Sequence, residues 1–87
     1  MYKLEISKRV VKFINTRTPK ERTRIAEALQ ELQDDPYQNS LDIKPLKGKE
    51  KHGYRLRIGG YRFLYALFDD QVLVYVYKAD NRGDVYK

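Results

Sequence analysis

Three arginines gather in the stretch YRLRIGGYRFLY, residues 54–65. A two-residue turn at Gly59-Gly60 would place Arg57 directly opposite Arg62 on neighbouring strands. Because side chains alternate along a strand, Arg55 would share their face of the sheet. Facing like charges destabilise a strand pair by up to about 1 kcal/mol, whereas a phosphate between two guanidinium groups would reverse the sign. The spacing therefore predicts a phosphate site, and the alternative is that the arginines splay apart to carboxylates such as Asp80, Asp84 or Glu50.

The C-terminal tail adds a fourth cation and an aromatic ring. Arg82 lies in the turn-like run DNRG, residues 80–83, and Tyr86 follows four residues later. A tail that returned along the sheet would bring both over the arginine face. Arginines for phosphates and a tyrosine on which a base stacks are the chemistry of single-stranded RNA recognition. The alternative for Tyr86 is a packing residue that anchors the C-terminus.

The net charge of +6 is concentrated around the same stretch. Residues 44–62 carry one acidic side chain, Glu50, and seven basic ones, while the other residues hold 11 of each sign. The basic residues that precede the hairpin are Lys44, Lys47, Lys49 and Lys51. Clustering of this kind is typical of a surface that binds a polyanion, and we expect these lysines to contact RNA or the ribosome. The alternative is a basic face that docks an acidic protein.

Length and composition limit the class of protein. A chain of 87 residues is expected to form one domain, residues 1–87, around a single core. It has no cysteine and a single histidine, which argues against disulfides, cysteine nucleophiles and a zinc site, so we expect neither metal nor cofactor. The sequence shows no apolar run long enough to span a membrane and no secretory signal, so a cytoplasmic protein without a membrane partner is expected.

The patterning predicts an α+β domain. Residues 2–6 alternate like a strand, and Ser7 can cap a helix over 8–15. Thr18-Pro19 with Glu21 forms a capping box that begins a second helix, which ends near residue 34. Residues 37–53 are predicted as a loop with an extended segment at 41–46. Three strands then follow at 54–58, 61–68 and 71–77, so the expected architecture is a four-stranded antiparallel sheet with an N-terminal helical hairpin on one face, in the order β-α-α-β-β-β.

The segments LKG (46–48), YRLRIGGYRFLY (54–65) and NRGDVY (81–86) resemble the RelE/ParE superfamily of bacterial toxins from type II toxin-antitoxin systems. The resemblance covers the whole chain and implies the RelE-like fold. For the RelE branch it implies an endoribonuclease, or mRNA interferase, that cuts mRNA in the A site of the 70S ribosome. It also implies a cognate antitoxin, with operator DNA bound only through the toxin–antitoxin complex.

The resemblance implies a role for each matching position. Arg55 and Arg57 match basic residues around the scissile phosphate, Arg62 matches an arginine that stabilises the transition state, and Arg82 and Tyr86 match an arginine and a base-stacking tyrosine of the C-terminal region. Many members carry a lysine in place of one of the first two arginines, and a histidine in place of Asn81. Arginine is a poor general base at neutral pH because its pKa exceeds about 12.

Arg82 could serve in place of an acid if the leaving oxygen is mainly stabilised rather than protonated. Glu50 and His52, which lie just before the hairpin, are the other candidates for acid or base. Two other functions remain open at this stage. One is a ParE-like protein that inhibits DNA gyrase without nuclease activity, and the other is a non-catalytic module that binds nucleic acid. An acidic amphipathic segment of an antitoxin would suit both the arginine face and the apolar sheet surface.

Overall fold

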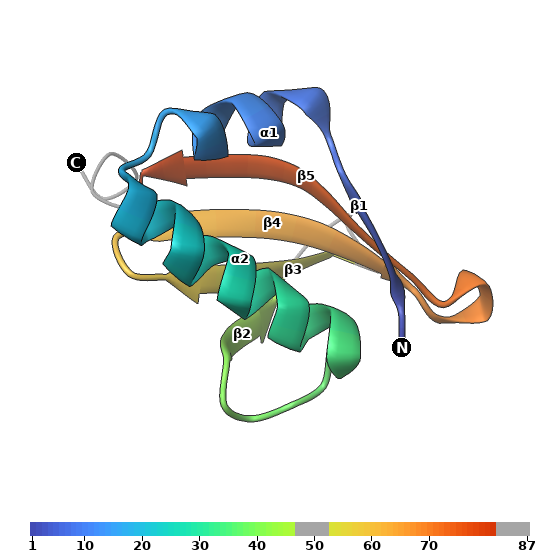
Figure 1. Cartoon of the computed structure of the whole chain (residues 1–87). Helices are drawn as coiled ribbons and strands as arrows, with labels where there is room; N and C mark the ends of the chain where they lie inside the picture. Colours follow the sequence, from blue (N-terminus) through green and yellow to red (C-terminus); the bar gives the residue numbers. More distant parts are fainter. Residues whose placement is uncertain (47–52, 82–87) are drawn as a thin grey trace.

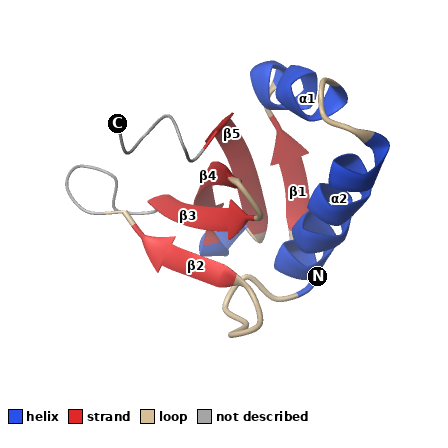
Figure 2. Ribbon diagram, turned by 90° about the vertical axis from the view of Figure 1, so that its left-hand side faces the viewer, coloured by secondary structure: helices blue, strands red, loops and turns tan. Residues whose placement is uncertain are grey.

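The computed structural model describes residues 1–46 and 53–81. Strand β1 (Lys3–Ile6) leads into helices α1 (Lys8–Asn15) and α2 (Pro19–Asp34), as Figure 1 shows. The strands that follow are β2 (Asp42–Pro45), β3 (Gly53–Ile58), β4 (Tyr61–Phe68) and β5 (Leu73–Asn81), with a short 3-10 turn, η1 (Asp69–Gln71), before the last. Both helices lie on one side of the sheet (Figure 2), so the predicted α+β class and helical layer are confirmed.

The strand count and one pairing differ from the prediction. The described residues form a five-stranded mixed sheet in the order β1-β5-β4-β3-β2. Strand β2 adds to the edge of β3, with Ile43 opposite Leu56, and β1 runs parallel to β5 rather than antiparallel. The predicted four-stranded antiparallel sheet was therefore wrong in these two respects. The extended segment expected at 41–46 contains a true strand, β2, because β3 provides a partner for its backbone hydrogen bonds. The short sequence of the segment alone does not predict that pairing.

Side-chain caps begin both helices. The Ser7 hydroxyl accepts a hydrogen bond from the Val10 amide at the start of α1. At α2, the Glu21 amide donates to the Thr18 hydroxyl at 3.2 Å, and the Glu21 carboxylate accepts from the Thr18 amide at 3.0 Å. The Tyr61 hydroxyl also donates to Glu21, which lowers the pKa of that carboxyl and ties α2 to β4. Among the described residues, no helix combines the length and apolarity needed to cross a membrane.

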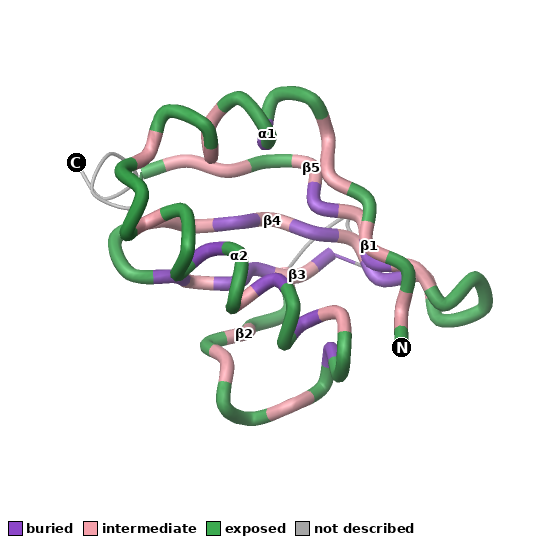
Figure 3. The backbone as a smooth tube through the Cα atoms, in the orientation of Figure 1, coloured by how far each residue is buried: buried purple, intermediate pink, exposed green. Residues whose placement is uncertain are grey.

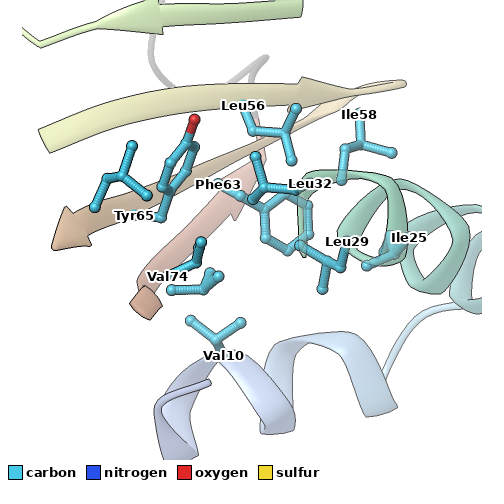
Figure 4. Packing of buried hydrophobic residues seen from close by; sticks show 11 residues of the cluster. Val10, Ile25, Leu29, Leu32, Leu56, Ile58, Phe63, Tyr65 and Val74 are labelled. Atoms are coloured by element: carbon cyan, nitrogen blue, oxygen red, sulfur yellow. The ribbon is translucent and has the colours of Figure 1, made fainter. Parts of the chain in front are cut away.

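One apolar cluster lies between the helices and the sheet. Figure 3 shows that buried positions follow the middle strands and the inner side of α2, and Figure 4 shows how the side chains meet. Its members are Val10, Ile25, Leu29, Leu32, Leu56, Ile58, Phe63, Tyr65, Leu67, Val74 and Val76. The residues from β3 and β4 in this cluster are those expected opposite the arginine face, so the predicted alternation of the hairpin is confirmed.

Tyr65 carries a hydroxyl that the core does not satisfy. The residue is fully buried, its ring stacks on Tyr54 at 5.4 Å, and its oxygen has no hydrogen-bond partner. Burial raises the pKa of this phenol. An unpaired buried hydroxyl costs about 1–3 kcal/mol, so Tyr65→Phe is expected to increase the free energy of unfolding by about 1 kcal/mol. Urea denaturation measures this, and Tyr61→Phe, which removes the hydroxyl that binds Glu21, is expected to change stability in the opposite direction.

The β3–β4 turn aligns the two arginines. Gly59 has a φ of 58°, while Gly60 does not adopt a positive φ, a pattern that fits a type II′ turn. A Cβ at Gly59 would also lie 3.1 Å from a guanidinium nitrogen of Arg24, whereas a Cβ at Gly60 would meet nothing within 4 Å. Gly59→Ala is therefore expected to lower the free energy of unfolding by about 1–2 kcal/mol, and Gly60→Ala by clearly less. Equal losses in chemical denaturation of the two variants would contradict this account of the turn.

Strand β5 begins and ends later than the predicted strand at 71–77. Val72 has a φ of 51° and forms the end of the preceding turn, which shifts the start to Leu73. A register shift between Leu64 and Tyr65 then keeps β5 paired with β4 as far as Asn81 opposite Tyr61. Because β5 continues past Tyr77, it brings Asp80 beside Arg62.

Candidate functional site

A row of four charged residues crosses the sheet face that lies away from the helices. Asp42 on β2 is opposite Arg57 on β3, Arg57 is opposite Arg62 on β4, and Arg62 is opposite Asp80 on β5. We call these four residues the charged row. The predicted register of Arg57 and Arg62 is confirmed, and the two facing arginines are flanked on both sides by a carboxylate.

Both flanking carboxylates form ion pairs with the arginines. Asp80 accepts from Arg62 through two contacts, Nε to Oδ1 at 3.1 Å and Nη2 to Oδ2 at 2.9 Å. Asp42 bridges two arginines, with Oδ1 at 3.0 Å from Arg55 Nη2 and Oδ2 at 3.5 Å from Arg57 Nη1. These pairs offset the repulsion between the facing guanidinium groups. The arginine-to-carboxylate alternative is thus present in the structure, with Asp80 as foreseen and with Asp42, which the sequence did not suggest.

A second row lies beside the first and is more positive. Lys44 on β2 is opposite Arg55, Arg55 is opposite Leu64, and Leu64 is opposite Lys78 on β5. The two rows together hold five cations and two carboxylates. The face therefore keeps an excess of positive charge, which extends from β2 to β5.

Arg55 is the most buried of the three arginines. The residue is only 9% exposed, and its Nε–H has no hydrogen-bond acceptor. A buried donor of a charged group without a partner is costly, so its presence calls for an explanation. This nitrogen is closed off from solvent, so an anion at the sheet face would contact the more exposed guanidinium groups of Arg57 and Arg62, whose side chains are 25% and 24% exposed.

Several predicted site residues lie outside the described part of the chain. These are Arg82 and Tyr86 of the tail, and the residues before β3, namely Lys47, Lys49, Glu50, Lys51 and His52. Arg62 is only partly exposed, because its side chain is 24% exposed and paired with Asp80. Of the predicted site residues, the structure therefore brings together Arg55, Arg57, Arg62 and Lys44.

Asp42 is the residue at this site that the sequence did not reveal. Its signal was present in the segment expected to be extended, since a strand at 41–46 would pair with residues 54–58. However, no short turn joins the two segments, so the sequence does not determine which residues of one face which residues of the other. Without a register, nothing in the sequence distinguishes Asp42 from the other acidic residues of the chain.

Comparison with known proteins identifies the family. No protein-family profile matches the chain. A protein of Methanocaldococcus jannaschii named "Putative toxin RelE1" is 32% identical over 87 residues, which cover 99% of this chain and 96% of the relative.

Solved structures agree in fold. RelE in the RelE–RelB complex of Pyrococcus horikoshii superimposes with a TM-score of 0.83 at 27% identity, covering 94% of this chain and 96% of that one. The RelB–RelE antitoxin–toxin complex of Methanococcus jannaschii gives 0.74 at 27% identity, with 95% of each chain covered. The isolated Escherichia coli RelE toxin, at 23% identity and a TM-score of 0.75 over 93% of this chain and 84% of that one, shares the fold. The fold and the full-length similarity thus agree, and the chain belongs to the RelE family of toxins.

Proposed function

We propose that the protein is the toxin of a type II toxin-antitoxin system and a ribosome-dependent endoribonuclease that cleaves mRNA. The observation that supports this most directly is the arginine cluster on the open sheet face. Arg55 and Arg57 on β3 are close enough for the carboxylate of Asp42 to bridge them, and Arg62 on β4 lies opposite Arg57. The side chains of Arg57 and Arg62 are 25% and 24% exposed, so a phosphate group could reach them from solvent.

The chemistry that suits these residues is attack of the 2′-oxygen on the adjacent phosphorus. The 2′-hydroxyl loses a proton, a bond forms to phosphorus, and the bond to the 5′-oxygen of the next nucleotide breaks, which leaves a cyclic phosphate and a 5′-hydroxyl. Charge on the phosphoryl oxygens increases in the transition state, and guanidinium donors fixed around them stabilise it. In this proposal, Arg62 and Arg57 hold the phosphoryl oxygens, while Arg55 adds positive charge beside them.

The remaining roles rest on the family resemblance for the tail residues and on charge and sequence position for the others. Arg82 would stabilise the leaving oxygen and Tyr86 would stack on a base, while Lys44 and the lysines at 47, 49 and 51 would contact RNA of the ribosome. Glu50 and His52 are the candidates for proton transfer, which arginine performs poorly at neutral pH. No metal or other cofactor has a part in this mechanism.

A cognate antitoxin is the second part of the proposal. Two of the similar structures are complexes of RelE with RelB. An acidic segment is the partner that the positive sheet face of this chain would attract. Such a partner would prevent phosphate from entering by covering the arginines. Operator DNA would be bound through this complex, and the protein would act in the cytoplasm, where ribosomes translate.

The proposal is tested with purified protein, ribosomes and one defined mRNA. Cuts that map within codons in the A site, and that require ribosomes, are expected for the wild type and absent for Arg62→Gln. If the mRNA stays intact and DNA gyrase loses supercoiling activity instead, the ParE-like function is correct. If RNA is bound with a steep salt dependence but never cut, the protein is a binding module.

A further inference from the structure

We infer that Asp42 and Asp80 are positioning residues that fix the arginines on either side of a phosphate site. The inference rests on the proposed function and goes beyond it, because neither carboxylate touches the reacting atoms in that mechanism. It starts from the order of charges in the row, which is negative, positive, positive, negative from β2 to β5. Each outer carboxylate attracts an inner guanidinium away from the centre of the row.

The Arg62–Asp80 pair has the geometry that fixes a guanidinium plane. Its two hydrogen bonds, at 3.1 and 2.9 Å, run from two nitrogens of one side chain to both oxygens of the other. The two side chains are 24% and 28% exposed, so water competes with the pair only partly. A bidentate pair of this kind sets orientation as well as proximity, whereas a single contact leaves the plane free to turn. The pair uses two of the five N–H donors of the guanidinium.

Asp42 fixes the other two arginines together. Each of its oxygens faces a different guanidinium, so Arg55 and Arg57 are both held toward β2. Asp42 itself remains 47% exposed in its side chain, so the bridge costs little desolvation of the carboxylate. As a result, the β3 arginines are held toward β2 and Arg62 is held toward β5.

This arrangement predicts opposite effects on binding and on catalysis. A nearby carboxylate repels phosphate, so its removal increases the attraction of the site for RNA. The same removal frees the guanidinium to turn. Its N–H donors, which Asp80 or Asp42 holds in place in the wild type, must then be ordered during the reaction. Loss of alignment of this kind reduces rates by up to about 100-fold. If the carboxylate only neutralised charge, its removal would instead raise both the affinity and the cleavage rate, or change neither.

The decisive experiment compares Asp80→Asn with Asp70→Asn in single-turnover cleavage of ribosome-bound mRNA. Both changes remove one negative charge, and Asp70 is exposed in η1, at the other end of β4 from Arg62. We expect Asp80→Asn to lower the maximal cleavage rate about 10- to 100-fold while the ribosome concentration at half-saturation stays equal or falls. Asp70→Asn is expected to match the wild type. An unchanged rate for Asp80→Asn, a rate that rises with affinity, or a weakened affinity at an unchanged maximal rate would each overturn the inference.

A second measurement does not depend on cleavage. In ¹⁵N-labelled protein, the Arg62 Nε–H signal is expected to be sharp and slow to exchange with water in the wild type. It is expected to broaden and exchange quickly in Asp80→Ala, with an otherwise native spectrum and melting curve. If the signal is the same in both, or if the variant unfolds, Asp80 has no positioning role. This measurement tests the positioning role even if the wild type cuts no mRNA. Failure of the proposed nuclease function and failure of the positioning role therefore give different results.

Discussion

Arg62→Lys is expected to lose nearly all mRNA cleavage although it keeps the positive charge. Lysine presents a point charge and cannot form the two parallel hydrogen bonds that Arg62 makes with Asp80. It also cannot hold two phosphoryl oxygens with one planar group. Removal of one preorganised donor from a transition state costs about 10²- to 10³-fold in rate, so we expect a decrease of at least about 100-fold in the single-turnover rate.

The control is Arg9→Lys on α1. Arg9 also makes a side-chain hydrogen bond, from Nε to the Tyr77 carbonyl at 2.7 Å, but it is exposed on the helical layer. This variant is expected to cleave at the wild-type rate. If Arg62→Lys cleaves as well as Arg9→Lys, charge alone is sufficient and the bidentate role is wrong. If Arg62→Lys loses both activity and its cooperative melting transition, the loss of activity results from unfolding of the protein.

The hairpin was predictable because local chemistry fixes it. A two-residue glycine turn determines which residues face each other, and the alternation of side chains then determines their faces. From these two rules, the pairing of Arg57 with Arg62 and the burial of Leu56 and Phe63 follow without any long-range information. The capping box of α2 was predictable for the same reason, since all its contacts lie within four residues.

The partners of the arginines were less predictable because they come from other strands. Asp42 lies on β2, whose pairing with β3 follows a connection without a short turn that would set the register. Asp80 lies beyond the predicted end of its strand, and a register shift at Leu64/Tyr65 determines which β5 residue meets Arg62. Likewise, the parallel pairing of β1 with β5 is a property of the assembled sheet. Alternation in the sequence cannot show the direction of a neighbour.

The positions of the basic residues along the sequence do not by themselves single out the arginine face. Residues 3–24 carry eight basic and two acidic side chains, an excess as large as that of residues 44–62. Much of this second basic segment lies on α1 and the first half of α2, on the other side of the core from the charged row. Position along the chain therefore did not single out the arginine face. Its distinguishing features are spatial: burial, facing register and shared carboxylates.

Arg55→Met is expected to change stability and activity in opposite directions. Arg55 is 9% exposed, its Nε–H has no acceptor, and it forms an ion pair with the half-exposed carboxylate of Asp42. Replacing a buried ion pair by apolar side chains of similar volume is often neutral or stabilising by about 1–4 kcal/mol, whereas removing one partner is costly only when it leaves the other charge buried. Asp42 would keep its contact with Arg57 and its exposure to water, so the change leaves no buried lone carboxylate. We therefore expect the free energy of unfolding to rise by about 1 kcal/mol.

Cleavage by the same variant is expected to fall at least about tenfold, because it removes one of the three guanidinium groups proposed to stabilise the transition state. Urea denaturation and single-turnover cleavage measure the two effects on one preparation. Lys44→Met is the matched control, since it removes a cation from the position opposite Arg55 but from an exposed side chain. It is expected to leave stability unchanged and to weaken ribosome binding with a smaller loss of rate. If Arg55→Met is less stable than the wild type, the arginine is a structural member of the sheet, whereas a stable, inactive variant shows that the chain retains a destabilising cation for its function.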